Sequence, residues 1–141
     1  MTFWDSSALV ALLVEEPDST KRGRQLTADP IIAVWWGTLV ECESAIQRRI
    51  REGALARADA RLAQDRLAQL AGAWHEVAPA SALRRLALRL LRTHPLRAAD
   101  ALQLAAALTL AGAGPDGLRF VSADSRLNEA AQIENLIAVT G

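Results

Sequence analysis

The chain opens with Thr2-Phe3-Trp4-Asp5-Ser6-Ser7-Ala8-Leu9, a short apolar run that stops at a carboxylate, followed by two hydroxyls and a second apolar run. This pattern predicts a buried strand that turns directly into a helix. Asp5 then lies at the carboxyl end of the strand, and Ser7 is placed to cap the helix. Ligands of open α/β sheets bind along that edge. The function therefore depends on which other acids the fold brings there.

Apolar runs of strand type alternate with helical patterns along the rest of the chain. The alternation predicts an α/β fold in which helices cover both faces of a parallel sheet. Two helices over 38–52 and 54–71, separated at Gly53, predict a helical hairpin. A helix over 18–27 is polar enough to lie on the surface. The remaining strands are expected at 31–34, 74–77, 118–122 and 136–139, the remaining helices near Ser7 and at 81–92, 97–111 and 125–131, and a Gly/Pro turn at 112–117.

Length and composition indicate a single globular domain over residues 1–141. The chain is 51% hydrophobic and carries 16 basic and 16 acidic side chains, so its net charge does not indicate a nucleic-acid binder. Its single cysteine cannot form an internal disulfide, which fits a reducing compartment. The early apolar runs are too short to span a bilayer. We therefore expect a soluble cytoplasmic protein without membrane contact.

Four acids share one kind of position, at the carboxyl end of an expected strand or in the first turn of an expected helix. They are Asp5, Glu41, Asp100 and Asp124. A parallel sheet collects such positions along one edge. Each acid also has a structural interpretation. Asp5 and Asp124 suit helix N-caps. Glu41 completes a capping box with Thr38, and Asp100 can pair with Arg97. Asp100 is the most informative, because its neighbours are apolar and a bare carboxylate among them is costly.

The chemistry of these acids depends on how closely they converge. At about 5 Å, each like-charged pair costs on the order of 3 kcal/mol at an effective dielectric of about 20. Such a cluster either holds protons or binds a cation. Oxygen ligands without histidine or cysteine suit Mg²⁺, with Mn²⁺ as the second choice. The sequence has no Gly-rich phosphate loop and no zinc-type spacing. His75 and His94 are expected to be surface or loop residues.

Four segments follow one another in an order and spacing that is specific when taken together. They are Phe3-Trp4-Asp5-Ser6-Ser7-Ala8-Leu9, Glu41-Cys42-Glu43-Ser44-Ala45-Ile46-Gln47-Arg48, Leu96-Arg97-Ala98-Ala99-Asp100-Ala101-Leu102-Gln103-Leu104-Ala105-Ala106-Ala107 and Phe120-Val121-Ser122-Ala123-Asp124-Ser125-Arg126-Leu127. The chain thereby resembles the PIN-domain ribonucleases, specifically the VapC-like toxins of type II toxin-antitoxin pairs. The resemblance implies a PIN-like three-layer α/β/α sandwich. It also implies that the four acids form a catalytic, metal-binding quartet, supported by the hydroxyls of Ser7 and Ser122.

By the same resemblance, the protein is a Mg²⁺-dependent endoribonuclease that hydrolyses RNA phosphodiester bonds with a metal-activated water. The expected substrate is single-stranded or loop RNA. The candidate phosphate contacts are Arg48, Arg84, Arg85 and Arg97, for which a solvated helix face is the structural alternative. A cognate antitoxin is expected to lay a segment over the acidic groove, with the Trp35-Trp36 region as one possible interface. A homodimer is also expected.

Two other functions stay open from the sequence. One is another Mg²⁺-dependent phosphohydrolase acting on DNA or small phosphates, although Ser7 stands where a haloacid-dehalogenase-type phosphatase carries its second Asp. The other is a non-catalytic PIN-fold interaction domain whose acids serve as helix caps. Turnover of RNA separates both from the nuclease.

Overall fold

The computed structural model describes residues 1–112 and 117–140, in which five strands alternate with seven helices. The strands are β1 (Thr2–Trp4), β2 (Ile32–Trp35), β3 (His75–Val77), β4 (Arg119–Val121) and β5 (Ile137–Ala138). The helices are α1 (Ser6–Leu13), α2 (Ser19–Ala28), α3 (Thr38–Arg51), α4 (Arg57–Ala73), α5 (Ser81–Thr93), α6 (Ala98–Ala111) and α7 (Ser125–Ile133). Every expected strand and helix is present, while residues 113–116 of the expected Gly/Pro turn lie outside the described residues. None of these helices is both long and apolar enough to cross a membrane.

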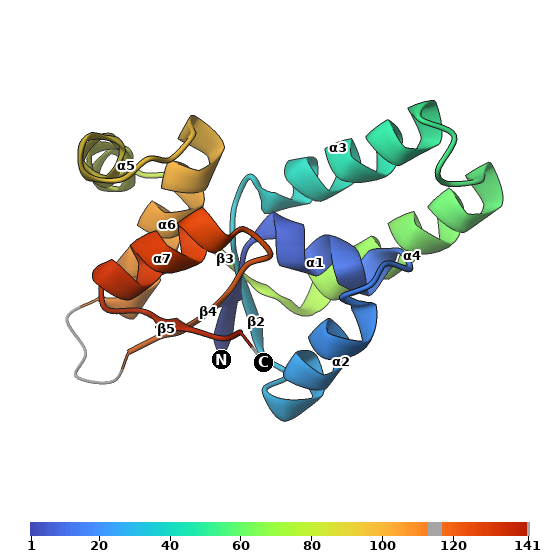
Figure 1. The fold of residues 1–141 in the computed structure, drawn as a ribbon, viewed down its shortest axis with the longest axis horizontal. Coiled ribbons are helices and arrows are strands. Elements are labelled where there is room, and N and C mark those ends of the chain that lie inside the picture. The colour runs from blue at the N-terminus through green and yellow to red at the C-terminus, as the bar shows by residue number, and fades with distance from the viewer. Residues whose placement is uncertain (113–116, 141) are drawn as a thin grey trace.

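The strands pair in parallel in one sheet, in the order β3-β2-β1-β4-β5 (Figure 1). β1 lies at the centre, with Phe3 opposite Ala33 of β2 and Phe120 of β4. The chain first extends the sheet on one side of β1, through β2 and β3, and then crosses to β4 and β5 on the other side. The carboxyl end of β1 is therefore a topological switch point, where open α/β sheets form a crevice.

Helices cover both faces of the sheet, because successive strand residues point to opposite sides. Phe3 and Phe120 belong to a core beneath α5, α6 and α7, and their rings stack with centroids 5.8 Å apart. Trp4 and Val121, one residue further along each strand, belong to a second core beneath α1, α3 and α4. Figure 1 shows the same division, with α1 to α4 on one side of the sheet and α5 to α7 on the other. The predicted three-layer α/β/α sandwich with a central parallel sheet is confirmed.

The predicted helical hairpin is formed by α3 and α4, which pack against each other. Between them, Gly53 adopts a φ of 72°, in the left-handed region that favours glycine. The N–H groups of Ala54 and Leu55 both donate to the Arg49 carbonyl, at 2.9 and 3.2 Å. These bonds close the turn, so α4 begins at Arg57 and not at Ala54 as the sequence predicted.

Two polar segments lie where the sequence predicts but carry buried side chains. The polar helix α2 lies mostly at the surface, whereas its Arg22 is only 2% exposed and its Gln25 only 6% exposed. His94 lies in the loop between α5 and α6, as expected, but is 9% exposed, and its Nε2 lies 2.7 Å from Oε2 of Glu134. Side-chain polarity suggests exposure, but it does not reveal which polar groups find a partner inside the fold.

Candidate functional site

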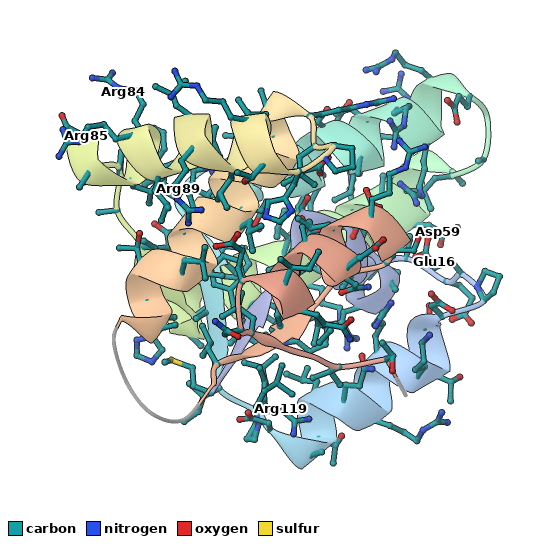
Figure 2. All side chains as sticks on the ribbon, turned by 60° about the vertical axis from the view of Figure 1, so that its left-hand side comes forward. Glu16, Asp59, Arg84, Arg85, Arg89 and Arg119 are labelled. Atoms are coloured by element: carbon teal, nitrogen blue, oxygen red, sulfur yellow. The ribbon has the colours of Figure 1, made fainter. Side chains whose placement is uncertain are left out.

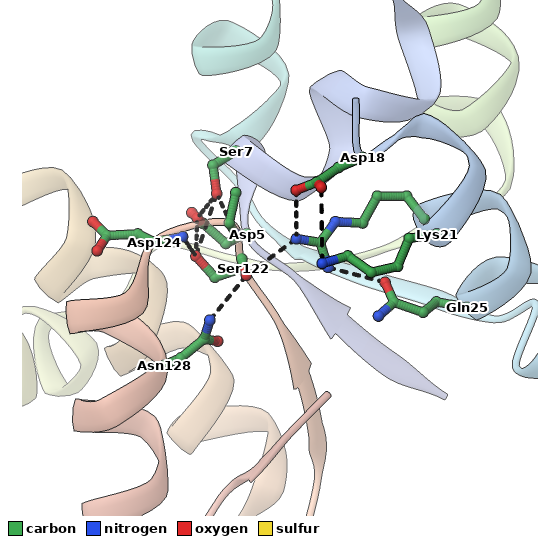
Figure 3. Close-up of polar contacts among 10 residues, drawn as sticks. Asp5, Ser7, Asp18, Lys21, Gln25, Ser122, Asp124 and Asn128 are labelled. Atoms are coloured by element: carbon green, nitrogen blue, oxygen red, sulfur yellow. Dashed lines mark hydrogen bonds and ion pairs between the residues drawn. The ribbon is translucent and has the colours of Figure 1, made fainter. Parts of the chain in front are cut away.

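Asp5 directly follows β1 and is 4% exposed. Its main-chain N–H donates to the Val121 carbonyl at 2.9 Å, which extends the β1–β4 pairing by one residue. Asp5 is also the N-cap residue of α1, but its carboxylate makes no capping bond. Instead, Oδ2 accepts from Ser7 Oγ at 2.5 Å and from Ser122 Oγ at 2.8 Å (Figure 3). The expectation that Ser7 caps α1 was wrong, because its hydroxyl donates to Asp5.

The two serine hydroxyls join the turn after β1 to the turn after β4. Ser7 Oγ accepts from the N–H of Ala123 at 3.0 Å, and Ser122 Oγ accepts from the N–H of Asp124 at 3.0 Å. The hydroxyls themselves are 3.3 Å apart. The position of the Asp5 carboxylate is thus coupled to the start of α7.

Glu41 lies in the first turn of α3, and both of its carboxylate oxygens are held by side chains from other elements. Oε2 accepts from Ser6 Oγ at 2.9 Å, and Oε1 accepts from Gln103 Nε2 at 3.1 Å. The N-cap of α3 is Gly37, and the Thr38 hydroxyl also accepts from Gln103, at 3.1 Å. The capping-box interpretation of Glu41 was therefore wrong, because Glu41 turns toward α1 and α6.

Asp100 and Asp124 sit at the starts of α6 and α7. Asp100 Oδ2 accepts from the main-chain N–H of Arg97 at 3.4 Å, a long bond. Asp124 is the N-cap of α7, where Oδ1 accepts from the N–H groups of Arg126 and Leu127 at 2.9 and 3.4 Å. The capping interpretation is correct for Asp124. Figure 3 shows its carboxylate directed away from Asp5.

The acids act on one another electrostatically. Burial is the largest cause that raises the pKa values of Asp5, Glu41 and Asp100 above their ordinary range. Neighbouring charge adds to each shift: Asp100 raises the pKa of Asp5, Asp5 raises that of Glu41, and Asp124 raises that of Asp100. Hydrogen bonds to the carboxylates oppose these shifts without cancelling them. The cluster is one that a cation would stabilise.

Three of the acids line one open cleft of about 650 Å³. Its lining comprises Ser7, Glu41, Arg48, Pro95, Arg97, Ala99, Asp100, Asp124 and Arg126. Asp5 does not line it but bonds to Ser7, which does. A second cleft of about 600 Å³ shares Ser7, Glu41 and Arg48 and continues along α1 and α3 past Val40 and Arg49. The two clefts together form a groove across the carboxyl edge of the sheet.

The candidate arginines divide into two pairs. Arg48 and Arg97 line the acidic cleft. Arg84 lines a separate cavity beside Trp35 and Pro79. Figure 2 shows Arg84 and Arg85 together at the start of α5, projecting outward from the helix. The fold therefore brings the first pair to the acids, and Arg84 and Arg85 occupy a different surface.

The carboxylate oxygens that line the cleft suit a hard metal ion that keeps part of its hydration shell, and not a metal enclosed entirely by protein ligands. Within residues 1–112 and 117–140, no three Asp, Glu, His or Cys side chains are close enough together to hold a metal by themselves. Mg²⁺ retains several waters and commonly takes only one or two carboxylates, with substrate phosphate completing its shell. Oxygen donors on an open cleft meet that requirement, whereas a soft or enclosed metal would need more protein ligands.

Sequence reasoning missed Ser6, Gln103 and Arg126. Gln103 is fully buried and follows Asp100 by three residues, so both lie on one face of α6. A buried amide in an otherwise apolar helix was a usable signal, because buried polar groups require partners. Ser6 carried no signal that distinguished it from Ser7.

Comparison with known proteins places the chain in a family. The sequence matches the PIN domain over residues 2–133, and the chain therefore belongs to the PIN domain family. No curated protein matches the sequence.

Solved structures resemble the fold over nearly its whole length. PAE2754 from Pyrobaculum aerophilum aligns with a TM-score of 0.69 and 21% identity over 98% of this chain and 90% of that chain. FitAcB from Neisseria gonorrhoeae aligns with a TM-score of 0.68 and 14% identity over 99% of this chain and 97% of that chain. VapC20 from Mycobacterium tuberculosis is described as a sarcin-ricin-loop-cleaving toxin. It aligns with a TM-score of 0.66 and 19% identity over 92% of this chain and 95% of that chain. At these identities, the likeness establishes the fold alone.

Proposed function

We propose that this chain is a Mg²⁺-dependent endoribonuclease of the VapC-like toxin type, built as one PIN domain over residues 1–141. The observation that carries the proposal is the cluster of carboxylates at the switch point of the sheet, in which three acids have raised pKa values. If the acids served only as ion-pair partners or helix caps, they would not need to lie near one another, because gathering like charges is unfavourable without a cation. Membership of the PIN domain family supports a nuclease.

In the cleft, one or two of Glu41, Asp100 and Asp124 would contact the ion directly and the others would reach it through its bound waters, with Asp5 as the buried member of the set. Mn²⁺ meets the same donor requirement. A bound ion lowers the pKa of a coordinated water and offsets charge that develops on the phosphate.

The remaining chemistry belongs to the chain's own residues. Glu41 is fixed at both oxygens by Ser6 and Gln103, which suits a rigid ligand. Asp100 has a single long hydrogen bond and lines the cleft, so its carboxylate can turn toward a water. Its raised pKa makes it a better proton acceptor than an ordinary aspartate. We assign it the orientation of the attacking water.

The substrate path follows the groove. Arg48 and Arg97 line the acidic cleft, Arg126 joins them at the start of α7, and all three are exposed. Guanidinium groups bind phosphate through paired N–H donors. A single strand crossing from the α1–α3 side would meet Arg48 where the two clefts join. Flexible RNA suits an open groove, because a splayed backbone can reach a recessed acid.

A protein partner is part of the proposal. Trp36, Leu39 and Val40 are 57%, 40% and 70% exposed, and Val40 lines the groove. An antitoxin segment that covers this apolar patch would also cover the acids. We further propose a homodimer, which light scattering of the purified chain would reveal as twice the mass of one chain.

The direct test is cleavage of a labelled single-stranded RNA by the purified chain, with Mg²⁺, with Mn²⁺ and with EDTA. We expect cleavage with either ion, none with EDTA, and a loss of at least about a hundredfold in Asp100→Asn. Asp65→Asn, the same substitution at an exposed position on α4, is the matched control and should cleave normally.

The outcomes separate the alternatives. Hydrolysis of DNA or small phosphates with no action on RNA would favour a different phosphohydrolase. Normal binding of a partner with no turnover of any phosphodiester would favour a non-catalytic interaction domain, in which Asp124 serves only as the cap of α7.

A further inference from the structure

Arg22 is a buried charge on the polar helix α2, where Gln25 is the other buried residue. Its residue is 2% exposed, and its guanidinium lies behind the turn that follows β4. Nη1 donates to Gln25 Oε1 at 3.0 Å, and Nη2 donates to the Ser122 carbonyl at 3.4 Å. The ion pair with Asp18 is loose, at 3.6 Å, and the Asp18 side chain is 44% exposed. A buried arginine requires better pairing than this to add stability.

The pairing is incomplete in a second respect. Within the described part of the chain, Arg22 Nε is buried and has no hydrogen-bond partner. Burial lowers the pKa of Arg22, in line with its incomplete pairing, although Asp18, Glu16 and Asp5 act in the opposite direction. A charge buried with such incomplete pairing calls for a role other than stability.

Ser122 is the residue that connects Arg22 to the acids. Its carbonyl accepts from Arg22 and also from Asn128 Nδ2 at 2.9 Å, whereas its hydroxyl faces the other way and donates to Asp5 (Figure 3). The same hydroxyl accepts from the N–H of Asp124. A shift of the Ser122 main chain would therefore move the hydroxyl that holds one acid and the turn that begins with another.

We propose that Arg22 is a positioning residue for the metal-binding carboxylates: it anchors the Ser122 carbonyl from behind and thereby aligns the Ser122 hydroxyl with Asp5 and the Asp124 turn with the cleft. The inference rests on the proposed function, since it concerns the alignment of the same acids. Arg22 suits the task because its planar fork bonds two acceptors in fixed directions, Gln25 and Ser122. A lysine would present a single mobile ammonium in their place.

The experiment measures Mn²⁺ binding to the metal-free chain without RNA, by calorimetry or by the EPR signal of free Mn²⁺, together with thermal unfolding. In Arg22→Met we expect Mn²⁺ affinity to fall by about tenfold, the usual effect of losing a residue that orients a ligand. The melting temperature should stay the same or rise, because Asp18 remains solvated and Asn128 still bonds the Ser122 carbonyl. Arg22→Lys should recover only part of the affinity.

Asp18→Asn is the matched control, since it removes the ion pair to Arg22 without touching Ser122, and it should bind Mn²⁺ normally. Wild-type affinity in folded Arg22→Met, or an equal loss in Asp18→Asn, would overturn the inference. If Arg22→Met does not fold, Asn128→Ala and Arg22→Lys take its place. Asn128→Ala removes the other donor to the same carbonyl, and unchanged affinity in both variants would also overturn it.

The wild-type chain distinguishes this inference from the function on which it rests. Absence of Mn²⁺ binding in the wild type would remove the proposed function and the inference together. A different result would remove only the inference: the wild type cleaves RNA with Mn²⁺, and Arg22→Met binds Mn²⁺ with the same affinity as the wild type.

Discussion

Replacing Asp5 by asparagine should make the metal-free protein more stable. The side chain is 4% exposed, and burial is the main reason that its pKa is raised, with the charge of Asp100 adding to it. Ionising Asp5 in the folded state places a buried charge near other acids, whereas in the unfolded state that charge is in water. Asparagine keeps the size and an acceptor oxygen for the Ser7 and Ser122 hydroxyls but removes the charge.

The size of the effect follows from two opposing contributions. Two like charges about 8 Å apart cost roughly 2 kcal/mol at an effective dielectric of about 20. The partial exposure of Glu41 and Asp100 reduces each repulsion to about 1 kcal/mol. The amide group of asparagine lowers the stability of the variant by about 1 kcal/mol, because its N–H donors lack a clear acceptor. Relief of burial leaves a net gain of about 1 to 2 kcal/mol, or a rise in Tm of roughly 3 to 8 °C for a domain of this size.

The assay is thermal unfolding of wild type and Asp5→Asn in EDTA over a pH series. Because the folded pKa of Asp5 lies above its ordinary value of 3.8, the wild type loses relative stability as pH rises through the folded pKa. The advantage of Asp5→Asn should be small below about pH 4 and reach its full size at higher pH. A lower Tm for Asp5→Asn at neutral pH would refute the reasoning, because it would mean that the Asp5 charge stabilises the fold.

Adding metal should reverse the order of stability. An ion present at about a hundred times its dissociation constant stabilises the protein that binds it by roughly 2.7 kcal/mol, more than the advantage of Asp5→Asn. Wild type should gain this stability with Mn²⁺, and Asp5→Asn should gain much less. Equal gains in both proteins would show that Asp5 takes no part in binding the ion.

Three further changes probe neighbouring contacts. Gln103→Leu should weaken Mn²⁺ binding severalfold in calorimetry, because Glu41 loses the donor that fixes Oε1; an unchanged affinity would contradict this role. Asp124→Ala should lose about 1 kcal/mol in urea unfolding through loss of the α7 cap, whereas Asp124→Asn should keep most of it; equal losses would argue against the cap. Burial alone would raise the pKa of Glu134, but hydrogen bonds from Arg89 and His94 lower it overall. Glu134→Gln should therefore lose about 1 to 2 kcal/mol at neutral pH, and this difference should shrink as pH falls below the ordinary value of 4.5 and through the folded pKa. A gap that does not change with pH would rule out the ion pair as its cause.

The fold could be predicted from the sequence because its strands are short, apolar and separated by helical patterns. The first stretch shows why: Phe3 and Trp4 point to opposite cores, so both must be apolar, and the run ends at Asp5, just past the carboxyl end of β1. The alternation of strand and helix then requires a parallel sheet. That sheet brings the carboxyl ends of β1 and β4 together.

The contacts within the site were less predictable, because they depend on tertiary register. The Thr38–Glu41 spacing matches a capping box, yet Gln103 from another helix pairs with both residues. Local spacing cannot show such a competitor. The polarity of the helix over 18–27 predicted its place at the surface but not the burial of Arg22, because only the packing of α2 behind the β4–α7 turn gives the Arg22 guanidinium an interior acceptor.

The central claim is that acids far apart in the sequence jointly bind a divalent ion, and crystals soaked in MnCl₂ test it most directly through anomalous diffraction. The account predicts a manganese peak in the cleft, coordinated by one or two carboxylates of the Glu41, Asp100 and Asp124 set and by water, and a weaker or missing peak in Asp100→Asn. A cleft without manganese in the wild type, or a peak that Asp100→Asn leaves unchanged, would contradict it.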